Sequence, residues 1–176
     1  MIRRYGEAVK VGKPYRRRPG VYAVLLRGGE VLLTHQAAPI PEYQLPGGGI
    51  DKGEAPIAAL HREIYEETGW HIAPPRWLGT YRRFTFMPEY DMWAEKVCTI
   101  YVARPTLCQG PPSEAGHTAV WLDPLSPVAP VVPSLSLEAF GFSSDDLATR
   151  SEERSVGKEG GVVGVGGGGG VSGRGG

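Results

Sequence analysis

Residues 48–70 constrain the fold of this chain more than any other part of its sequence. Residues 55–68 are good helix formers, and Pro56 suits the first turn of a helix, where its missing N–H costs nothing. Gly69 is well placed to cap the C-terminal end of that helix. The segment therefore predicts a helix over residues 55–68, held between two glycine-containing turns.

The predicted helix carries two stripes of side chains with different chemistry. The first stripe is apolar and should anchor the helix on the core; it consists of Ile57, Leu60 and Ile64, with Ala58 and His61 beside them. The second stripe is acidic, because Glu63, Glu66 and Glu67 have the i, i+3, i+4 spacing of one helical face. Clustered carboxylates repel one another, so a stripe without lysines between them predicts a bound divalent cation.

The residues around the acidic stripe favour the same chemistry. Three consecutive glycines at residues 47–49 predict a loop whose backbone closely approaches a bulky group. Arg62 lies beside the stripe and can pair with Glu54 or with a metal-binding glutamate, which would fix their side chains. Oxygen ligands of this kind suit Mg²⁺ first and Mn²⁺ next, and substrate phosphates commonly complete such a site.

The rest of the chain alternates between predicted strands and loops. The apolar, β-rich runs predict strands at 21–26, 30–35, 43–45, 77–87, 96–103 and 118–122. Gly28 and Gly29 should turn the first two into a hairpin. Residues 88–95 and the Pro- and Gly-rich residues 104–116 are expected to be connecting loops.

Changes in composition predict three parts. Residues 1–18 are polar and basic, and we interpret them as a basic N-terminal arm or an irregular first edge of a sheet. Residues 19–142 should form the folded domain, with a second helix over 134–140. Residues 143–176 should be a disordered tail, because eleven of its last seventeen residues are glycine and bury too little apolar surface.

Charge and cysteine content exclude several classes of protein. The chain has 19 basic and 19 acidic side chains, so no net charge directs it to nucleic acid or to a membrane. Cys98 and Cys108 are too few for a disulfide framework or a zinc site and fit reduced thiols. The sequence has neither an apolar run long enough to cross a bilayer nor the apolar stretch of a secretory signal. We therefore expect a cytoplasmic location.

Residues 48–70 match the pattern G-x5-E-x7-R-E-U-x-E-E-x-G-U at every defining position, where U is a bulky apolar residue. The segment thus resembles the Nudix box, and the order of the flanking strands is similar to that of a Nudix domain. The resemblance implies an α/β fold, an α/β/α sandwich on a mixed sheet in which the box forms a loop–helix–loop. It also implies Mg²⁺- or Mn²⁺-dependent hydrolysis of a nucleoside diphosphate linked to another moiety.

The resemblance also implies roles for individual residues. The implied metal ligands are Glu63, Glu66, Glu67 and the backbone carbonyl of Gly47 or Gly48. Glu54 and Arg62 would be the supporting pair. Water attack on phosphorus also needs a proton acceptor, for which Glu67, Glu63 and Glu114 are the candidates and Glu89, Asp91 and Glu95 the weaker ones. Glu114 stands in a loop shortly before the last predicted strand, where an exposed carboxylate without a role is an equal alternative.

Three readings of function stay open at this point. The first is a pyrophosphohydrolase acting on a small nucleotide or related diphosphate. The second, suggested by the basic residues 1–18, is an RNA 5′-end pyrophosphohydrolase. The third is a non-catalytic Nudix domain that senses a ligand, against which the intact box argues. The sequence does not name the group beyond the diphosphate. Many relatives are homodimers, but no residue here fixes an interface.

Overall fold

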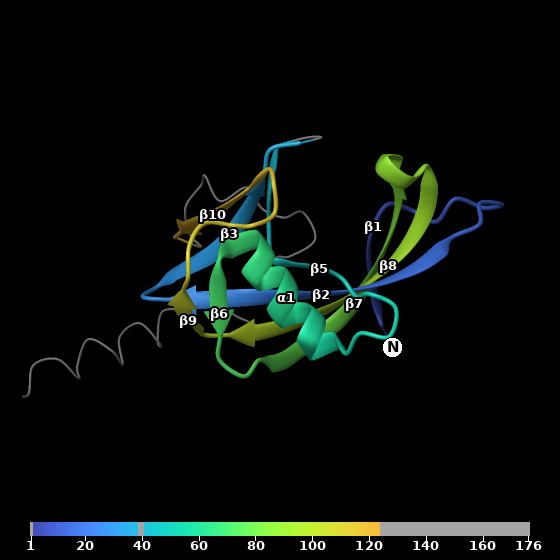
Figure 1. Ribbon diagram of the computed structural model, residues 1–176. Helices are drawn as coiled ribbons and strands as arrows, with labels where there is room; N and C mark the ends of the chain where they lie inside the picture. The colour runs from blue at the N-terminus through green and yellow to red at the C-terminus, as the bar shows by residue number, and fades with distance from the viewer. Residues whose placement is uncertain (1, 39–40, 124–176) are drawn as a thin grey trace, which may run out of the picture.

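The apolar runs of the chain fold into a sheet that is crossed by one helix (Figure 1). The structure is a computed structural model and describes residues 2–38 and 41–123. Its elements, in chain order, are β1 (Arg3–Gly6), β2 (Arg16–Arg27), β3 (Glu30–Gln36), β4 (Glu42–Gln44), β5 (Gly47–Gly49), α1 (Pro56–Thr68), β6 (Trp70–Ile72), β7 (Arg76–Met87), the 3-10 turn η1 (Pro88–Tyr90), β8 (Met92–Ala103), β9 (Pro105–Cys108) and β10 (His117–Leu122).

The main sheet is mixed. Its strand order is β1-β7-β8-β2-β3-β10, with β4 added to β3 and β5 added to β2. Strand β2 lies parallel to β8 and antiparallel to β3, and β1 lies parallel to β7 at one edge. A separate two-stranded sheet pairs β6 with β9. The predicted hairpin at Gly28 and Gly29 is confirmed, because Leu25 pairs with Leu32 and Arg27 with Glu30.

The sheet buries apolar side chains on both faces, as alternating residues of a strand point to opposite sides. On one face Val21, Ala23 and Leu25 of β2 pack in a cluster with Leu60 and Ile64 of α1. Residues that point to the other face of the sheet form a second cluster with their neighbours: Val24, Val31, Leu33, Leu45, Tyr81, Cys98 and Ile100. Cys98, which lies within the strand predicted at 96–103, is buried at 3% exposure.

The predicted helix is confirmed, but its anchor differs from the prediction. Gly69 caps α1 with φ 72°, and its N–H donates to the carbonyl of Tyr65 at 2.8 Å. The buried apolar residues are Ala59, Leu60 and Ile64, whereas Ile57 is 41% exposed and Ala58 is exposed. Burial begins only at Ala59, so the first turn of α1 lies outside the packed part of the helix.

Several predicted loops contain paired strands. The three glycines at 47–49 form β5, which pairs antiparallel with β2. The connection predicted over 88–95 is shorter, because η1 and a left-handed Asp91 (φ 45°) turn the chain and β8 begins at Met92. The loop predicted over 104–116 includes β9. These strands are short or glycine-rich, so they lack the alternating apolar pattern on which the strand predictions depend.

The structure places part of the basic N-terminal segment in the sheet. Arg3–Gly6 forms the edge strand β1, and β2 begins at Arg16, so residues 1–18 are not simply an arm. The predicted helix at 134–140 and the predicted tail at 143–176 lie outside the described residues. The α/β class with a mixed sheet is confirmed. Within residues 2–38 and 41–123, the structure shows no helix long and apolar enough to span a membrane.

Candidate functional site

Helix α1 brings the three glutamates of its acidic stripe to one side of the site, and their side chains differ in how far they are buried. The side chains of Glu67, Glu63 and Glu66 are 10%, 13% and 40% exposed, respectively. The apolar residues Leu60 and Ile64 on another stripe fix the helix on β2, so the carboxylates are positioned by a rigid element. The structure therefore brings together the three residues that the spacing predicted to share a face.

Glu67 is the deepest of these carboxylates and has the most altered acidity. Its Oε2 accepts a hydrogen bond from the backbone N–H of Gly47 at 2.9 Å. Burial, together with the nearby charges of Glu63, Glu114 and Glu66, raises the pKa of Glu67 to about 8, against the lowering effect of the hydrogen bond from Gly47. Burial also raises the pKa of Glu63. Both carboxylates therefore ionise less readily than an exposed glutamate.

Close contacts on both sides of β5 require glycine at two of its three positions. A side chain at Gly47, whose φ is 137°, would overlap the backbone of Val21 and Tyr22 in β2. A side chain at Gly48 would overlap the carboxylate of Glu63 instead. At Gly49, a Cβ would meet nothing within 4 Å. Thus β5 is pressed between strand β2 and the acidic stripe of α1, which is the close backbone approach that the three glycines predicted.

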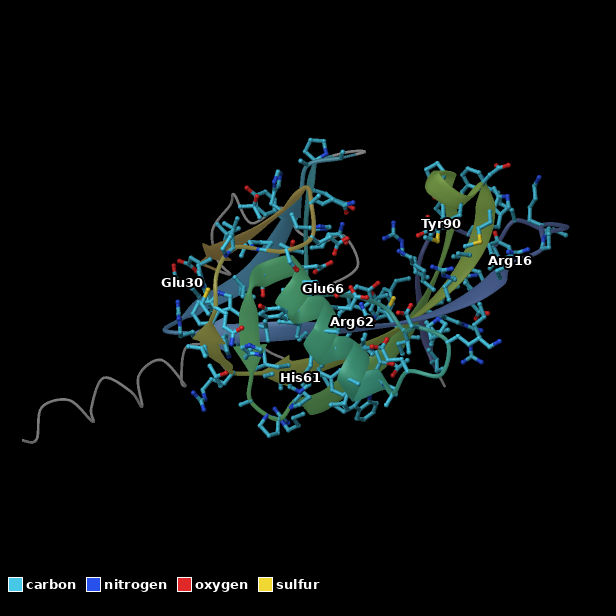
Figure 2. The ribbon with its side chains drawn as sticks, viewed as in Figure 1. Arg16, Glu30, His61, Arg62, Glu66 and Tyr90 are labelled. Atoms are coloured by element: carbon cyan, nitrogen blue, oxygen red, sulfur yellow. The ribbon has the colours of Figure 1, made fainter. Side chains whose placement is uncertain are left out.

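Arg62, which Figure 2 labels beside Glu66 on α1, holds the carboxylates around it in fixed positions. Its guanidinium binds both oxygens of Glu54, each at 2.9 Å, in the bidentate geometry typical of arginine and carboxylate. It also donates to Glu63 at 2.8 Å, to Glu66 at 3.1 Å and to the carbonyl of Gly49 at 3.2 Å. The hydrogen bonds from Arg62 hold the pKa of Glu54 at about 2. Glu54 and Arg62 therefore form the pair that was predicted.

The segment before β10 closes the other side of the site. The backbone N–H groups of Ser113 and Glu114 donate to the carbonyl of Glu66 at 2.8 and 3.0 Å. These bonds fix Glu114 beside an open cleft of about 370 Å³ that is lined by Arg62, Glu63, Glu66, Ser113 and Glu114. The structure thus brings Glu114, predicted only from its position before the last strand, to the carboxylates of α1.

His117 is a site residue that the sequence reasoning did not single out. It begins β10, and its side chain is 8% exposed. Its Nε2 lies 3.9 Å from Oε1 of Glu67, and its Nδ1 lies 3.7 Å from Oε1 of Glu114. The signal that could have found it is its position three residues after Glu114, directly before the strand predicted at 118–122.

The donor set fits a hard divalent cation. Glu63, Glu66, Glu67 and Glu114 bring four carboxylates to one place, and the guanidinium of Arg62 is shared with Glu54. Carboxylate oxygens beside an open cleft are the ligands that Mg²⁺ and Mn²⁺ prefer, and water or phosphate can complete the coordination. A cation would also offset the repulsion that raises the pKa of Glu67. The roles of individual ligands, including the carbonyl of Gly48, stay predictions.

Comparison with known proteins identifies the relatives of this chain. The sequence profile of the NUDIX domain matches residues 16–133. The chain is 34% identical over 74 residues to a protein named putative 8-oxo-dGTP diphosphatase of Bacillus subtilis, a match that covers 42% of this chain and 50% of that protein. It is 48% identical over 65 residues to an RNA pyrophosphohydrolase of Mesorhizobium japonicum, covering 32% of this chain and 36% of that one.

Solved structures show the same fold. A NUDIX hydrolase from Nitrosomonas europaea superposes with a TM-score of 0.53 at 18% identity, covering 81% of this chain and 91% of that chain. The matches to the two curated relatives are shorter, so this chain spans half or less of the length of each. The fold therefore extends well beyond the segment over which sequence identity is clear.

Proposed function

The chain belongs to the Nudix family, and from this premise we propose that it is a divalent-metal-dependent pyrophosphohydrolase. The substrate would be a nucleoside diphosphate linked to another moiety, cleaved by attack of water on phosphorus. The observation that carries this proposal is the cluster of Glu63, Glu66 and Glu67 on α1, with Glu114 lining the same open cleft as Glu63 and Glu66. A diphosphate brings negative charge, so it can bind to such a cluster only together with cations.

Three contacts of the chain prepare this site before any substrate arrives. Arg62 orients Glu63 and Glu66 through charge-assisted hydrogen bonds. The N–H of Gly47 holds one oxygen of Glu67 and leaves the other free. Because these contacts come from a helix and a paired strand, the carboxylates need little reorganisation on binding. A divalent cation bound there would supply charge neutralisation for phosphate oxygens and would acidify a water molecule.

The proton acceptor in this reaction would be one of Glu67, Glu63 and Glu114. Burial gives Glu67 a pKa of about 8 without a cation, which places its proton exchange near neutral pH. Glu63 is closest to Arg62, whose guanidinium favours its charged form. Glu114 is the most exposed and lies on a separate segment. Glutamine variants at each position, compared by the pH dependence of kcat, would separate these three.

Mg²⁺ is the ion we propose first and Mn²⁺ second, because the ligands on α1 are hard oxygens. The most informative test is a screen of nucleoside triphosphates, dinucleoside polyphosphates, nucleotide sugars and 5′-triphosphorylated or capped RNA with each ion. We expect phosphate or pyrophosphate release that requires metal and stops when EDTA is added. Metal-dependent release from none of these compounds would favour a non-catalytic, ligand-sensing domain and would contradict the proposal.

An RNA 5′-end pyrophosphohydrolase is the second candidate. A relative with that name is 48% identical over 65 residues, and Arg16, Arg17 and Arg18 are exposed at the start of β2. RNA binding through such residues should weaken steeply as salt increases, because counterions are released from the phosphates. If hydrolysis of triphosphorylated RNA exceeds that of free nucleotides and its KM rises steeply with salt, this second reading is supported.

Location and assembly belong to the same proposal. Both cysteines are free thiols, Cys98 buried and Cys108 exposed, which suits a reducing compartment such as the cytoplasm. A homodimer, frequent in the family, is proposed without an interface. Light scattering of the purified chain would give its mass, and a monomer that hydrolyses substrate at the full rate would exclude a need for dimers.

A further inference from the structure

His117 occupies an unusual position between two carboxylates. It comes from β10, which packs beside the C-terminal part of α1 (Figure 1). Its two ring nitrogens face different acids, Nε2 toward Oε1 of Glu67 and Nδ1 toward Oε1 of Glu114. The three residues belong to different segments, so the packing of β10 against α1 is what brings them together.

Hydrogen bonds among the described residues do not account for the position of the His117 imidazole between the two carboxylates. The distances of 3.9 Å to Glu67 and 3.7 Å to Glu114 are too long for hydrogen bonds. Nδ1 of His117 is buried and has no hydrogen-bond partner among residues 2–38 and 41–123. The side chain is only 8% exposed, so water covers little of it. A buried imidazole that lies between two carboxylates without a hydrogen bond to either calls for a further group beside them.

The spacing matches what a metal ion requires. One possible ligand atom from each of Glu67, Glu114 and His117 lies within 4.8 Å of the others. Two ligands bound to one ion at about 2.1 Å each are separated by roughly 3–4 Å. One ion binds only one ring nitrogen of His117: Nε2 lies 3.9 Å from Oε1 of Glu67, within that range, and the limit of 4.8 Å for the set of three leaves only a small closing movement of the side chains. Oε1 of Glu67 is also available, because Gly47 bonds to Oε2.

We propose that Glu67, Glu114 and His117 form a mixed nitrogen and oxygen site for a divalent transition-metal ion, beside the all-oxygen ligands of the acidic stripe. This inference rests on the proposed function, since Glu67 would serve both sets of ligands. Imidazole binds Mn²⁺, Co²⁺ or Zn²⁺ better than it binds Mg²⁺, which prefers oxygen. The site should therefore take Mn²⁺ in preference to Mg²⁺, whereas the ligands from α1 alone accept either ion.

The direct test is the pulsed EPR spectrum of Mn²⁺ bound to the full chain after treatment with EDTA. Echo modulation reports nitrogen atoms that are bonded to the ion. We expect modulation from a directly bound imidazole nitrogen, which changes to the ¹⁵N pattern when only the histidines carry ¹⁵N. This measurement needs no substitution, so it cannot fail through misfolding. The modulation should vanish in His117→Gln and persist in His61→Gln, a matched control on α1.

Relative affinities provide the second readout. His117→Gln should weaken Mn²⁺ binding by about tenfold or more and leave Mg²⁺ binding nearly unchanged. An equal loss for both ions would indicate a merely structural role for His117 and would overturn the inference. Mn²⁺ that binds the wild-type chain without any histidine modulation would also overturn it, while the proposed function would survive. If the chain neither binds Mn²⁺ nor hydrolyses any nucleotide, the proposed function itself fails.

Discussion

The site on α1 and the far end of the β7–β8 hairpin differ in both charge and construction. The site collects carboxylates that are half-buried or buried and that are bonded to backbone or to Arg62. At the hairpin end, exposed cations of the N-terminal part of the chain lie over aromatic rings of the hairpin, Lys10 over Trp93 at 4.4 Å and Arg18 over Tyr90 at 5.1 Å. Figure 2 shows Tyr90 and Arg16 at this end, well apart from Arg62 and Glu66.

This difference leads us to assign catalysis to the site on α1 and substrate selection to the far end of the β7–β8 hairpin. Carboxylates fixed by backbone contacts suit a reaction whose geometry must not vary, whatever the substrate. Exposed cations and rings on a hairpin can adapt to different groups by stacking or by pairing with phosphate. We therefore expect changes in the site to lower kcat and changes at the hairpin end to alter KM.

The largest effect should come from Glu67→Gln. Glutamine keeps the shape of the side chain and can still accept the hydrogen bond from Gly47, so the fold should be retained. It removes the charge that a cation requires, and kcat should fall by about a thousandfold or more. The control is Glu95→Gln, which removes a carboxylate that pairs with Arg82 at 3.5 Å in the hairpin. Steady-state hydrolysis with circular dichroism would measure both; a fully active, folded Glu67→Gln would refute the ligand assignment.

The three glycines of β5 should separate stability from activity. Gly47→Ala introduces a Cβ into the backbone of β2, so thermal unfolding should show a loss of about 1–3 kcal/mol. Gly48→Ala meets only the carboxylate of Glu63, so the fold should survive while metal affinity and kcat fall about 10–100-fold. Gly49→Ala meets nothing within 4 Å and is the matched control. Equal activity of the Gly48 and Gly49 variants would show that the position of Glu63 is unimportant.

Arg62→Lys should have an intermediate effect. Lysine keeps the charge but lacks the planar fork that binds Glu54 at both oxygens while reaching Glu63 and Glu66. The carboxylates should become less well oriented, so metal affinity should fall about 10–100-fold. Calorimetric titration with Mn²⁺ would measure this change. Wild-type affinity in the lysine variant would mean that charge alone, and not geometry, supports the site.

The raised pKa of Glu67 makes the stability of the metal-free chain depend on pH. The folded-state pKa of about 8 exceeds the ordinary value of 4.5, so folding favours the protonated form. The resulting stabilisation is complete below pH 4.5 and is lost as pH rises through about 8. Urea unfolding in EDTA should therefore show a steeper fall between those values for wild type than for Glu67→Gln. Identical slopes would contradict the conclusion that burial and neighbouring carboxylates raise the pKa of Glu67.

The smallest effects should come from the hairpin end. Trp93→Ala removes a ring that contacts Lys10 and packs against Tyr15 and Phe86. We expect a KM change of about tenfold or less for a nucleotide substrate, the amount that one stacking contact supplies, with kcat nearly constant. Steady-state kinetics would resolve the two constants. A loss of kcat as large as that of Glu67→Gln would remove the distinction between the two regions.

The sequence predicts the site better than it predicts the sheet around it. The helix and its acidic stripe follow from spacing alone, since Pro56, Gly69 and the glutamates act through local geometry. Ile57 was assigned to the anchor because periodicity ignores where the packed part of a helix begins. The pairing of β6 with β9 was missed because two strands of three and four residues have no readable period.

Contacts between distant segments were the hardest to predict. Glu114 was placed near the site from its position before the last strand, and the structure brings it there through the bonds from its segment to the carbonyl of Glu66. His117 was not singled out, because its approach to Glu67 depends on the packing of β10 beside α1. The parallel pairing of β1 with β7 is likewise a long-range contact, and the basic, polar sequence of β1 gives no pattern that predicts it.

The central claim is that the acidic stripe of α1 binds the divalent cation on which hydrolysis depends. It is tested most directly by titrating Mn²⁺ into EDTA-treated protein, following the EPR signal of the free ion, and assaying hydrolysis in the same samples. For Glu63→Gln, Glu66→Gln and Glu67→Gln, Mn²⁺ affinity and hydrolysis should fall together, while Glu95→Gln should match wild type. Variants that lose hydrolysis but bind Mn²⁺ as tightly as wild type, or wild-type protein that hydrolyses its substrate in EDTA, would contradict the account.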